Sequence, residues 1–160
     1  MTRSPEREMQ HLFARNPRRV MAAVLGAVAR VSIDLVVNDQ ALFQHALSVI
    51  EQYGRGAVAE DAVEALRPAM ALAASRADRD EARAAWSAME AVVAVCDALL
   101  EPLPIVAEKK AYDAVAWVIE ALVWPEDDDP AVHAAARARV HALMSEIVRE
   151  TPAASLAVRR

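Results

Sequence analysis

Several residue types are scarce in this sequence of 160 residues. It has one cysteine, Cys96, so no disulfide can form within the chain, and we expect a cytoplasmic location. There are three glycines and 4% aromatic residues, and no stretch has the alternation or β-branched richness that strands require. The sequence therefore excludes a disulfide-stapled fold and gives no support to a sheet.

Motifs for catalysis and for ligands are scarce as well. There is no Gly-x-Ser-x-Gly nucleophile elbow, and Gly54 and Gly56 are followed by no Gly-Lys-Ser or Gly-Lys-Thr. Glu8-x-x-His11 has the spacing used in di-iron bundles, but no second copy exists. The four histidines are His11, His45, His133 and His141. We therefore predict a protein that is not an enzyme, with no catalytic residue, cofactor or metal site, although a site built from three of these histidines stays open.

Positive charge is in deficit, since the net charge is −5. Residues 1–80 hold ten basic and ten acidic side chains, whereas residues 81–160 hold eight and thirteen, so the negative excess lies in the second half. Proteins bind phosphate backbones through Lys and Arg. We therefore expect no nucleic-acid partner and favour a basic protein partner.

Long hydrophobic runs are lacking too. The run from Val20 to Ala29 is too short to span a bilayer, so we expect no membrane partner. Arg18-Arg19 before this run resembles the start of an export signal, but the acidic residues Glu6 and Glu8 precede it. We predict an ordinary buried helix here.

Alanine, in contrast, is abundant. It supplies 37 residues of a chain that is 56% hydrophobic, and it is the best helix former. We predict an all-α fold, with a single helical domain over residues 1–150 and a frayed C-terminal tail over residues 151–160. Six to seven helices are expected, over about residues 4–14, 18–37, 40–53, 59–77, 78–101, 105–123 and 130–149.

The stretch over residues 78–101 is expected to be the central helix. Apolar residues cover most of its circumference, and a helix of this kind must be covered on several sides. Asp78 and Glu81 predict a capping box at its start. Cys96 lies on the apolar face and is interpreted as a small core residue. Glu90 and Asp97 could serve acid–base chemistry, but we expect them to line the polar strip or to pair with Arg83 or Lys110.

Local signals define the neighbouring helices. Asn38-Asp39 predicts an N-cap, Gly54 predicts the residue after a helix end, and Pro68 predicts a kink or two shorter helices. Arg30 and Asp34, four residues apart, are expected to pair. Thr151-Pro152 is expected to end the last helix. The predicted inner row of the helix over residues 105–123 is Tyr112, Val115, Ile119 and Leu122.

The densest charge is the acidic run Glu126-Asp127-Asp128-Asp129, followed by Pro130. Asp129 is a good N-cap for the last helix, but one or two acids suffice for that, and four in a row repel each other. An acidic surface attracts a cationic partner and speeds encounter. We therefore predict a partner-binding surface made of Asp113, Glu120, Glu126, Asp127, Asp128 and Asp129.

The stretch from Asp39 to Val118 resembles a known group. Asp39, Ala46, Tyr53 and Gly56 occupy places similar to those in the alanine-rich, all-helical immunity proteins of bacterial polymorphic-toxin loci, relatives of the fifth immunity family. The Asp-Asp-Arg-Pro signature that often opens this region reads Asn38-Asp39-Gln40-Ala41 here. The resemblance implies a non-catalytic protein that binds and occludes a toxin.

Two alternatives remain open from the sequence. One is a homo-oligomeric helical scaffold or regulator, with Trp117 or Trp124 marking a self-association face, so a homodimer is possible. The other is a metal-dependent helical-bundle enzyme. An acidic binding protein that neutralises a basic toxin is the function we favour.

Overall fold

The computed structural model describes residue 7 and residues 17–157, with side chains described for residue 7 and residues 18–150. This part of the chain is all-helical, which confirms the predicted fold class. The helix expected over residues 4–14 and His11 lie outside the described residues. The described elements are α2 (Pro17–Arg30), the 3₁₀ helix η1 (Ile33–Leu35), α3 (Gln40–Gly54), α4 (Glu60–Arg79), α5 (Arg83–Leu100), α6 (Pro104–Val123) and α7 (Pro130–Ala157).

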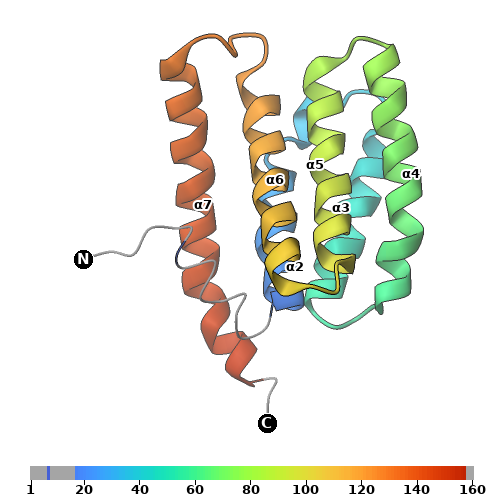
Figure 1. The fold of residues 1–160 in the computed structure, drawn as a ribbon, viewed down its shortest axis with the longest axis vertical. Helices are drawn as coiled ribbons and strands as arrows, with labels where there is room; N and C mark the ends of the chain where they lie inside the picture. Colours follow the sequence, from blue (N-terminus) through green and yellow to red (C-terminus); the bar gives the residue numbers. More distant parts are fainter. Residues whose placement is uncertain (1–6, 8–16, 158–160) are drawn as a thin grey trace.

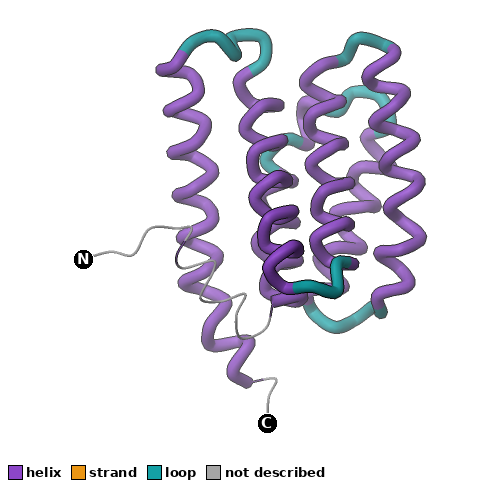
Figure 2. Tube along the Cα trace, in the orientation of Figure 1, coloured by secondary structure: helices purple, strands orange, loops and turns teal. Residues whose placement is uncertain are grey.

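The helices form two layers of roughly aligned rods (Figure 1). Helices α4, α5, α6 and α7 stand side by side in sequence order in one layer, and α2 and α3 lie behind them. The connections gather at the two ends of the bundle, where Figure 2 shows the loops in teal. The α4–α5 and α6–α7 connections lie at the same end, since these helices are joined as antiparallel hairpins. None of the helices in the described residues is long and apolar enough to cross a membrane.

Helix α5 is the centre of the bundle, as predicted. It contacts α2, α3, α4, α6 and η1. Eleven of its 18 residues are buried, among them Met89, Cys96 and Leu99. Removing this much apolar surface from water is the main stabilising contribution available to a fold of this composition.

The predicted start of the central helix is wrong. Asp78 lies inside α4, which continues to Arg79, and α5 begins at Arg83. The turn between them is a Schellman motif, because the N–H of Ala82 donates to the carbonyl of Ala77 at 2.9 Å and that of Glu81 donates to Asp78 at 3.1 Å. Glu81 occupies the left-handed position of this motif, with φ 56. This backbone arrangement prevails over the capping box that the side chains of Asp78 and Glu81 suggest.

Replacing Glu81 with glycine is expected to raise the free energy of unfolding by about 1 kcal/mol. The left-handed conformation costs a residue with a Cβ atom roughly 1–2 kcal/mol, and the greater freedom of glycine in the unfolded chain offsets part of that gain. Urea denaturation measures the change. Glu81→Ala, which removes the same charge but keeps the Cβ atom, should show no such gain, and equal stabilisation by both variants would contradict this account.

Helix α2 ends at Arg30, seven residues before the predicted end at Val37. The hydroxyl of the buried Ser32 donates to the carbonyl of Ala29 at 2.7 Å, and the backbone N–H of Ser32 donates to the same carbonyl at 3.1 Å. These bonds tighten the last turn and lead the chain into η1. The predicted Arg30–Asp34 pair is also wrong, since Arg30 pairs with Glu51 of α3 at 2.5 Å.

The two neighbouring glycines have different roles. Gly56, with φ +75, is the left-handed residue that follows α3, so the assignment of that role to Gly54 was wrong. Gly54 is the last residue of α3 and lies against α2. A Cβ atom there would lie 3.3 Å from the carbonyl oxygen of Arg19, so glycine at this position allows α3 to approach α2 closely.

Two prolines lie within helices. Helix α4 is continuous through Pro68, so the alternative of two shorter helices is wrong. Pro68 and Glu64 are both exposed, and water can therefore bond the Glu64 carbonyl that lacks its usual N–H donor. Helix α7 continues past Pro152 to Ala157, eight residues beyond the predicted end near Arg149.

Candidate functional site

The three tryptophans of the chain gather around Arg83, the first residue of α5. The Arg83 guanidinium carbon lies 4.8 Å from the ring centroid of Trp86 and 5.7 Å from that of Trp124. Trp117 of α6 meets Trp86 edge-on, with centroids 5.1 Å apart and planes at 76°. Because α5 and α6 form an antiparallel hairpin, the start of α5 faces the end of α6, which brings the four side chains together.

These aromatic rings line a pocket, which we call the tryptophan pocket. Its volume is about 260 Å³, and its charged side chains are Arg83, Glu120 and Asp127. Arg83 forms no ion pair among the described residues, and its recorded side-chain contacts are those with the two rings. Two carboxylates thus face one cation, so the pocket carries an uncompensated negative charge. It is lined by Arg83, Trp86, Ser87, Trp117, Glu120, Trp124 and Asp127.

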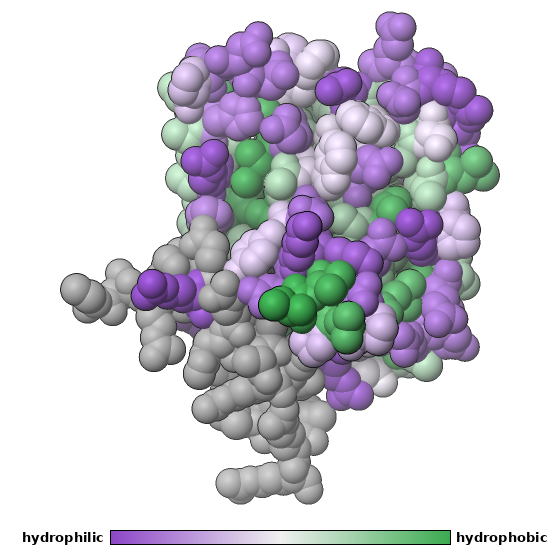
Figure 3. Space-filling view, viewed as in Figure 1, coloured by the Kyte–Doolittle hydropathy of each residue, from purple (hydrophilic) through white to green (hydrophobic). Residues whose placement is uncertain are grey.

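The predicted acidic residues lie on α6 and in the connection that follows it, and we call this surface the acidic edge. Asp113 and Glu120 line a shallow hollow of about 440 Å³ on α6 together with Ala116 and Trp117. Glu120 also lines the tryptophan pocket with Asp127, so the structure brings three of the six acids together. Glu126, Asp128 and Asp129 lie exposed in the α6–α7 connection. Figure 3 shows hydrophilic side chains covering the end of the bundle that holds this connection.

The acidic residues of the α6–α7 connection differ in the hydrogen bonds that they form. Asp129 caps α7 as predicted, because its Oδ1 accepts the N–H of Ala131 at 2.9 Å. The backbone carbonyl of Asp127 lies 2.9 Å from Nε2 of His133, which fixes the connection against α7. The side chains of Glu126 and Asp128 are exposed to solvent.

Several other carboxylates are neutralised within the chain. Each pairs with a basic residue, and two of the four pairs join two helices while the other two join a helix to a connection. None of the six predicted acids forms an ion pair among the described residues. The edge therefore keeps its negative charge. The internal pairs are Arg30–Glu51, Arg67–Asp97, Arg76–Asp39 and Lys110–Glu101.

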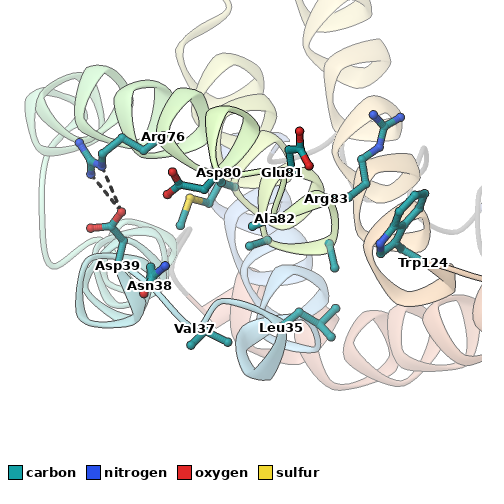
Figure 4. A pocket seen from close by; sticks show the side chains of 14 residues that line it. Leu35, Val37, Asn38, Asp39, Arg76, Asp80, Glu81, Ala82, Arg83 and Trp124 are labelled. Atoms are coloured by element: carbon teal, nitrogen blue, oxygen red, sulfur yellow. Dashed lines mark hydrogen bonds and ion pairs between the residues drawn. The ribbon is translucent and has the colours of Figure 1, made fainter.

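A groove of about 510 Å³ adjoins the tryptophan pocket (Figure 4). Val37, 81% exposed, and Trp124, 43% exposed, contribute apolar surface to it. Arg83 and Trp124 line both the groove and the tryptophan pocket, so the two hollows are continuous. Residues of three connections and of helices α4 and α5 line this groove, so no single helical period predicts it.

Asp39 lines the far end of the groove. It precedes α3 as predicted, but its side chain makes no capping bond. Its carboxylate pairs instead with Arg76 of α4 at 3.2 Å, shown dashed in Figure 4. The expected side-chain cap is therefore wrong, because Asp39 has a left-handed backbone, φ 62, that turns the carboxylate toward α4. Asp39 and Glu81, which share this conformation, both line the groove.

Glu90 and Asp97 do not have the partners that we predicted. Asp97 accepts a hydrogen bond from Nε of Arg67 on α4 at 2.7 Å, so neither Arg83 nor Lys110 is its partner. Burial raises the pKa of Glu90, while a hydrogen bond from Trp86 acts in the opposite direction. The Asp97 carboxylate therefore links α5 to α4 through this ion pair.

Cys96 and the described histidines do not form a second candidate site. Cys96 is fully buried, and this burial raises its pKa to about 12, as expected for a core residue. Within the described residues, no group of three or more His, Cys, Asp or Glu side chains is arranged to hold a metal ion. His45 is exposed on α3, whereas His133 and His141 lie on α7.

An apolar patch lies at the opposite end of the layer. Figure 3 shows it over the α5–α6 connection, where Leu103 and Ile105 are 58% and 79% exposed. Leu103 and Ile105 lie at the opposite end of α6 from the α6–α7 connection. The tryptophan pocket is therefore the place where aromatic surface and unpaired acid coincide.

Comparisons of the chain with protein-family models, curated proteins and solved structures found no match.

Proposed function

We propose that this protein is a non-catalytic binding protein of the immunity type, which neutralises a basic bacterial toxin domain. The acidic edge, made of Asp113, Glu120, Glu126, Asp127, Asp128 and Asp129, is the contact surface. The observation that carries the proposal is that these six carboxylates lie on α6 and in the connection that follows it, and none forms an ion pair among the described residues.

Unpaired surface charge of one sign has a physical consequence for association. It steers an oppositely charged partner into contact and disfavours partners of like charge, with a rate that falls as salt screens the field. The resemblance of residues 39–118 to immunity proteins supports a toxin as the partner. Helices that are locked together by internal ion pairs supply a rigid support for such a surface.

Charge reversal of the edge tests this function. A variant with lysine at Asp113, Glu120, Glu126, Asp127 and Asp128, and with Asp129→Asn to keep the α7 cap, is expected to associate at least about tenfold more slowly at low salt. The partner is the protein encoded beside this one, and stopped-flow mixing at several salt concentrations gives the rate and its salt dependence.

A matched control changes five exposed acids on α4 and α7 to lysine. It has nearly the same net charge but keeps the acidic edge, so its association is expected to remain fast. Equal slowing of both variants would show that only net charge matters, and unchanged rates for the edge variant would refute the proposed surface. The control residues are Glu60, Asp61, Glu64, Glu146 and Glu150.

A homo-oligomeric scaffold is the second candidate. The exposed side chains of Trp124 and Val37, which line the same groove, favour it, because exposed apolar surface marks interaction sites. Sedimentation equilibrium separates the two functions. A tight dimer that dissociates when Trp124 is changed to serine would favour the scaffold, and a monomer would favour the immunity-type function.

A further inference from the structure

We propose that the tryptophan pocket receives one arginine side chain of the basic partner, stacked on the indole rings and bonded to Glu120 and Asp127. This inference rests on the proposed function and identifies the chemical group that anchors the partner. The acidic surface would then contain a specific binding site for one side chain of the partner.

Arg83 shows that the pocket is suited to a guanidinium. Its own guanidinium carbon lies within 6 Å of two ring centroids, at 4.8 Å from Trp86 and 5.7 Å from Trp124. Tryptophan is the aromatic side chain that attracts cations most strongly, through the negative potential of its ring face. The edge-on contact of Trp117 with Trp86 helps to hold the ring of Trp86 in place.

Charge complementarity selects a cationic guest. Glu120 and Asp127 line the pocket, and Arg83 is the one cation among the described residues that lines it, so one further positive charge would neutralise it. A planar guanidinium can stack on a ring and donate two parallel hydrogen bonds to a carboxylate, whereas an ammonium group is a point charge. Arginine therefore fits the combination of rings and carboxylates better than lysine.

The pocket is accessible from the acidic edge. Trp124 is 43% exposed and Glu120 is exposed, so a side chain can enter without opening the bundle. Trp117 and Glu120 also line the hollow that contains Asp113. A partner drawn in by the acidic edge would thus arrive beside the pocket. A volume of about 260 Å³ with Arg83 in place leaves room for one guest side chain.

The test uses the full-length protein and N-acetyl-arginine methylamide as the probe. Tryptophan fluorescence and the NMR signals of the indole N–H groups report on the pocket directly, because all three tryptophans lie in it. We expect saturable shifts with a dissociation constant on the order of millimolar, which is reasonable for one side chain. The citrulline analogue has nearly the same shape but no charge, and it is expected to bind at least about tenfold more weakly.

Two variants locate the binding. Trp124→Leu and Glu120→Gln change exposed side chains, so the bundle should remain folded, and each is expected to weaken probe binding several-fold. Glu146→Gln is the matched control, since it removes an exposed carboxylate of α7 that belongs neither to the pocket nor to the acidic edge. Its affinity for the probe should be unchanged.

Equal shifts with the arginine and citrulline probes would overturn the proposal, and so would unchanged affinity in both pocket variants. Failure of the probe to bind, together with salt-dependent association of the whole partner, would refute the arginine site and leave the acidic edge intact. Binding of the probe without any effect of the edge variant on the whole partner would refute the proposed function and leave the pocket as a cation site.

Discussion

Replacing Leu99 with alanine is expected to lower the free energy of unfolding by about 2–5 kcal/mol. Leu99 is fully buried in α5, which contacts four other helices and η1. The substitution removes apolar surface from the core and leaves a cavity that the surrounding helices can fill only partly. Urea denaturation followed by circular dichroism measures the loss.

Leu72→Ala is the matched control for this prediction. It makes the same chemical change at a position in α4 that is 58% exposed, so it is expected to change the free energy of unfolding by no more than about 0.5 kcal/mol. The ratio of the two losses in unfolding free energy reports how completely the neighbouring helices cover α5. Similar small losses at both positions would show that α5 is not the centre of the bundle.

Replacing Arg18 with methionine is expected to lower the free energy of unfolding by about 2–3 kcal/mol, the range for hydrogen bonds to a charged group. The guanidinium of Arg18, on α2, donates through Nη1 to the carbonyl of Leu99 and through Nη2 to the carbonyl of Glu101. The C-cap residue Glu101 has an extended backbone, so α5 ends without a left-handed glycine cap. Arg18 therefore satisfies end carbonyls of the central helix and places positive charge at the negative end of its dipole.

Arg19→Met is the control for the Arg18 variant, because it removes the adjacent, exposed arginine with the same loss of charge. Its effect is expected to be within about 0.5 kcal/mol. Arg18→Lys keeps the charge but cannot bond both carbonyls in the same way, so it should lie between wild type and Arg18→Met. Equal effects of Arg18→Met and Arg19→Met in denaturant titrations would contradict the capping role.

Helix positions were predictable where the sequence carries a strong local signal. Helices α3 and α6 have nearly the expected bounds, since Asp39 precedes the first and Pro104 and Pro125 flank the second. The boundary between α4 and α5 was not predictable in the same way. The Asp78 and Glu81 side chains fit a capping box, but the Schellman bonds of Glu81 and Ala82 are backbone bonds that leave no pattern in the sequence.

The inner face of α6 shows a second limit. Apolar bulk favoured Tyr112, Val115, Ile119 and Leu122, of which Val115 is fully buried and the other three are half-buried at the margins of the core. Alanines, together with Val118 and Val123, hold the deepest positions, because small side chains allow two helix backbones to approach closely. In an alanine-rich chain, hydrophobic periodicity therefore predicts the helix correctly but assigns its buried face to a neighbouring side of the helix. The buried alanines of α6 are Ala107, Ala111, Ala114 and Ala121.

The acidic edge was visible as a run of charge, whereas the tryptophan pocket was not. Trp117 lies on α6 and Trp124 is the C-cap residue that follows it, whereas Arg83 and Trp86 share a face of α5. Their meeting depends on how α5 and α6 are paired, which periodicity does not specify. A search for aromatic and charged residues at the start of α5 and at the end of α6, the open end of this predicted hairpin, would have found Arg83 and the three tryptophans.

The burial of Cys96 turns the only thiol of the sequence into a reporter of motion. Its side chain has no exposed surface, and its raised pKa keeps it protonated at neutral pH. An alkylating reagent can therefore react only with molecules in which the helices around α5 have separated. The labelling rate of native protein measures how often the bundle opens, without a mutation or an attached probe.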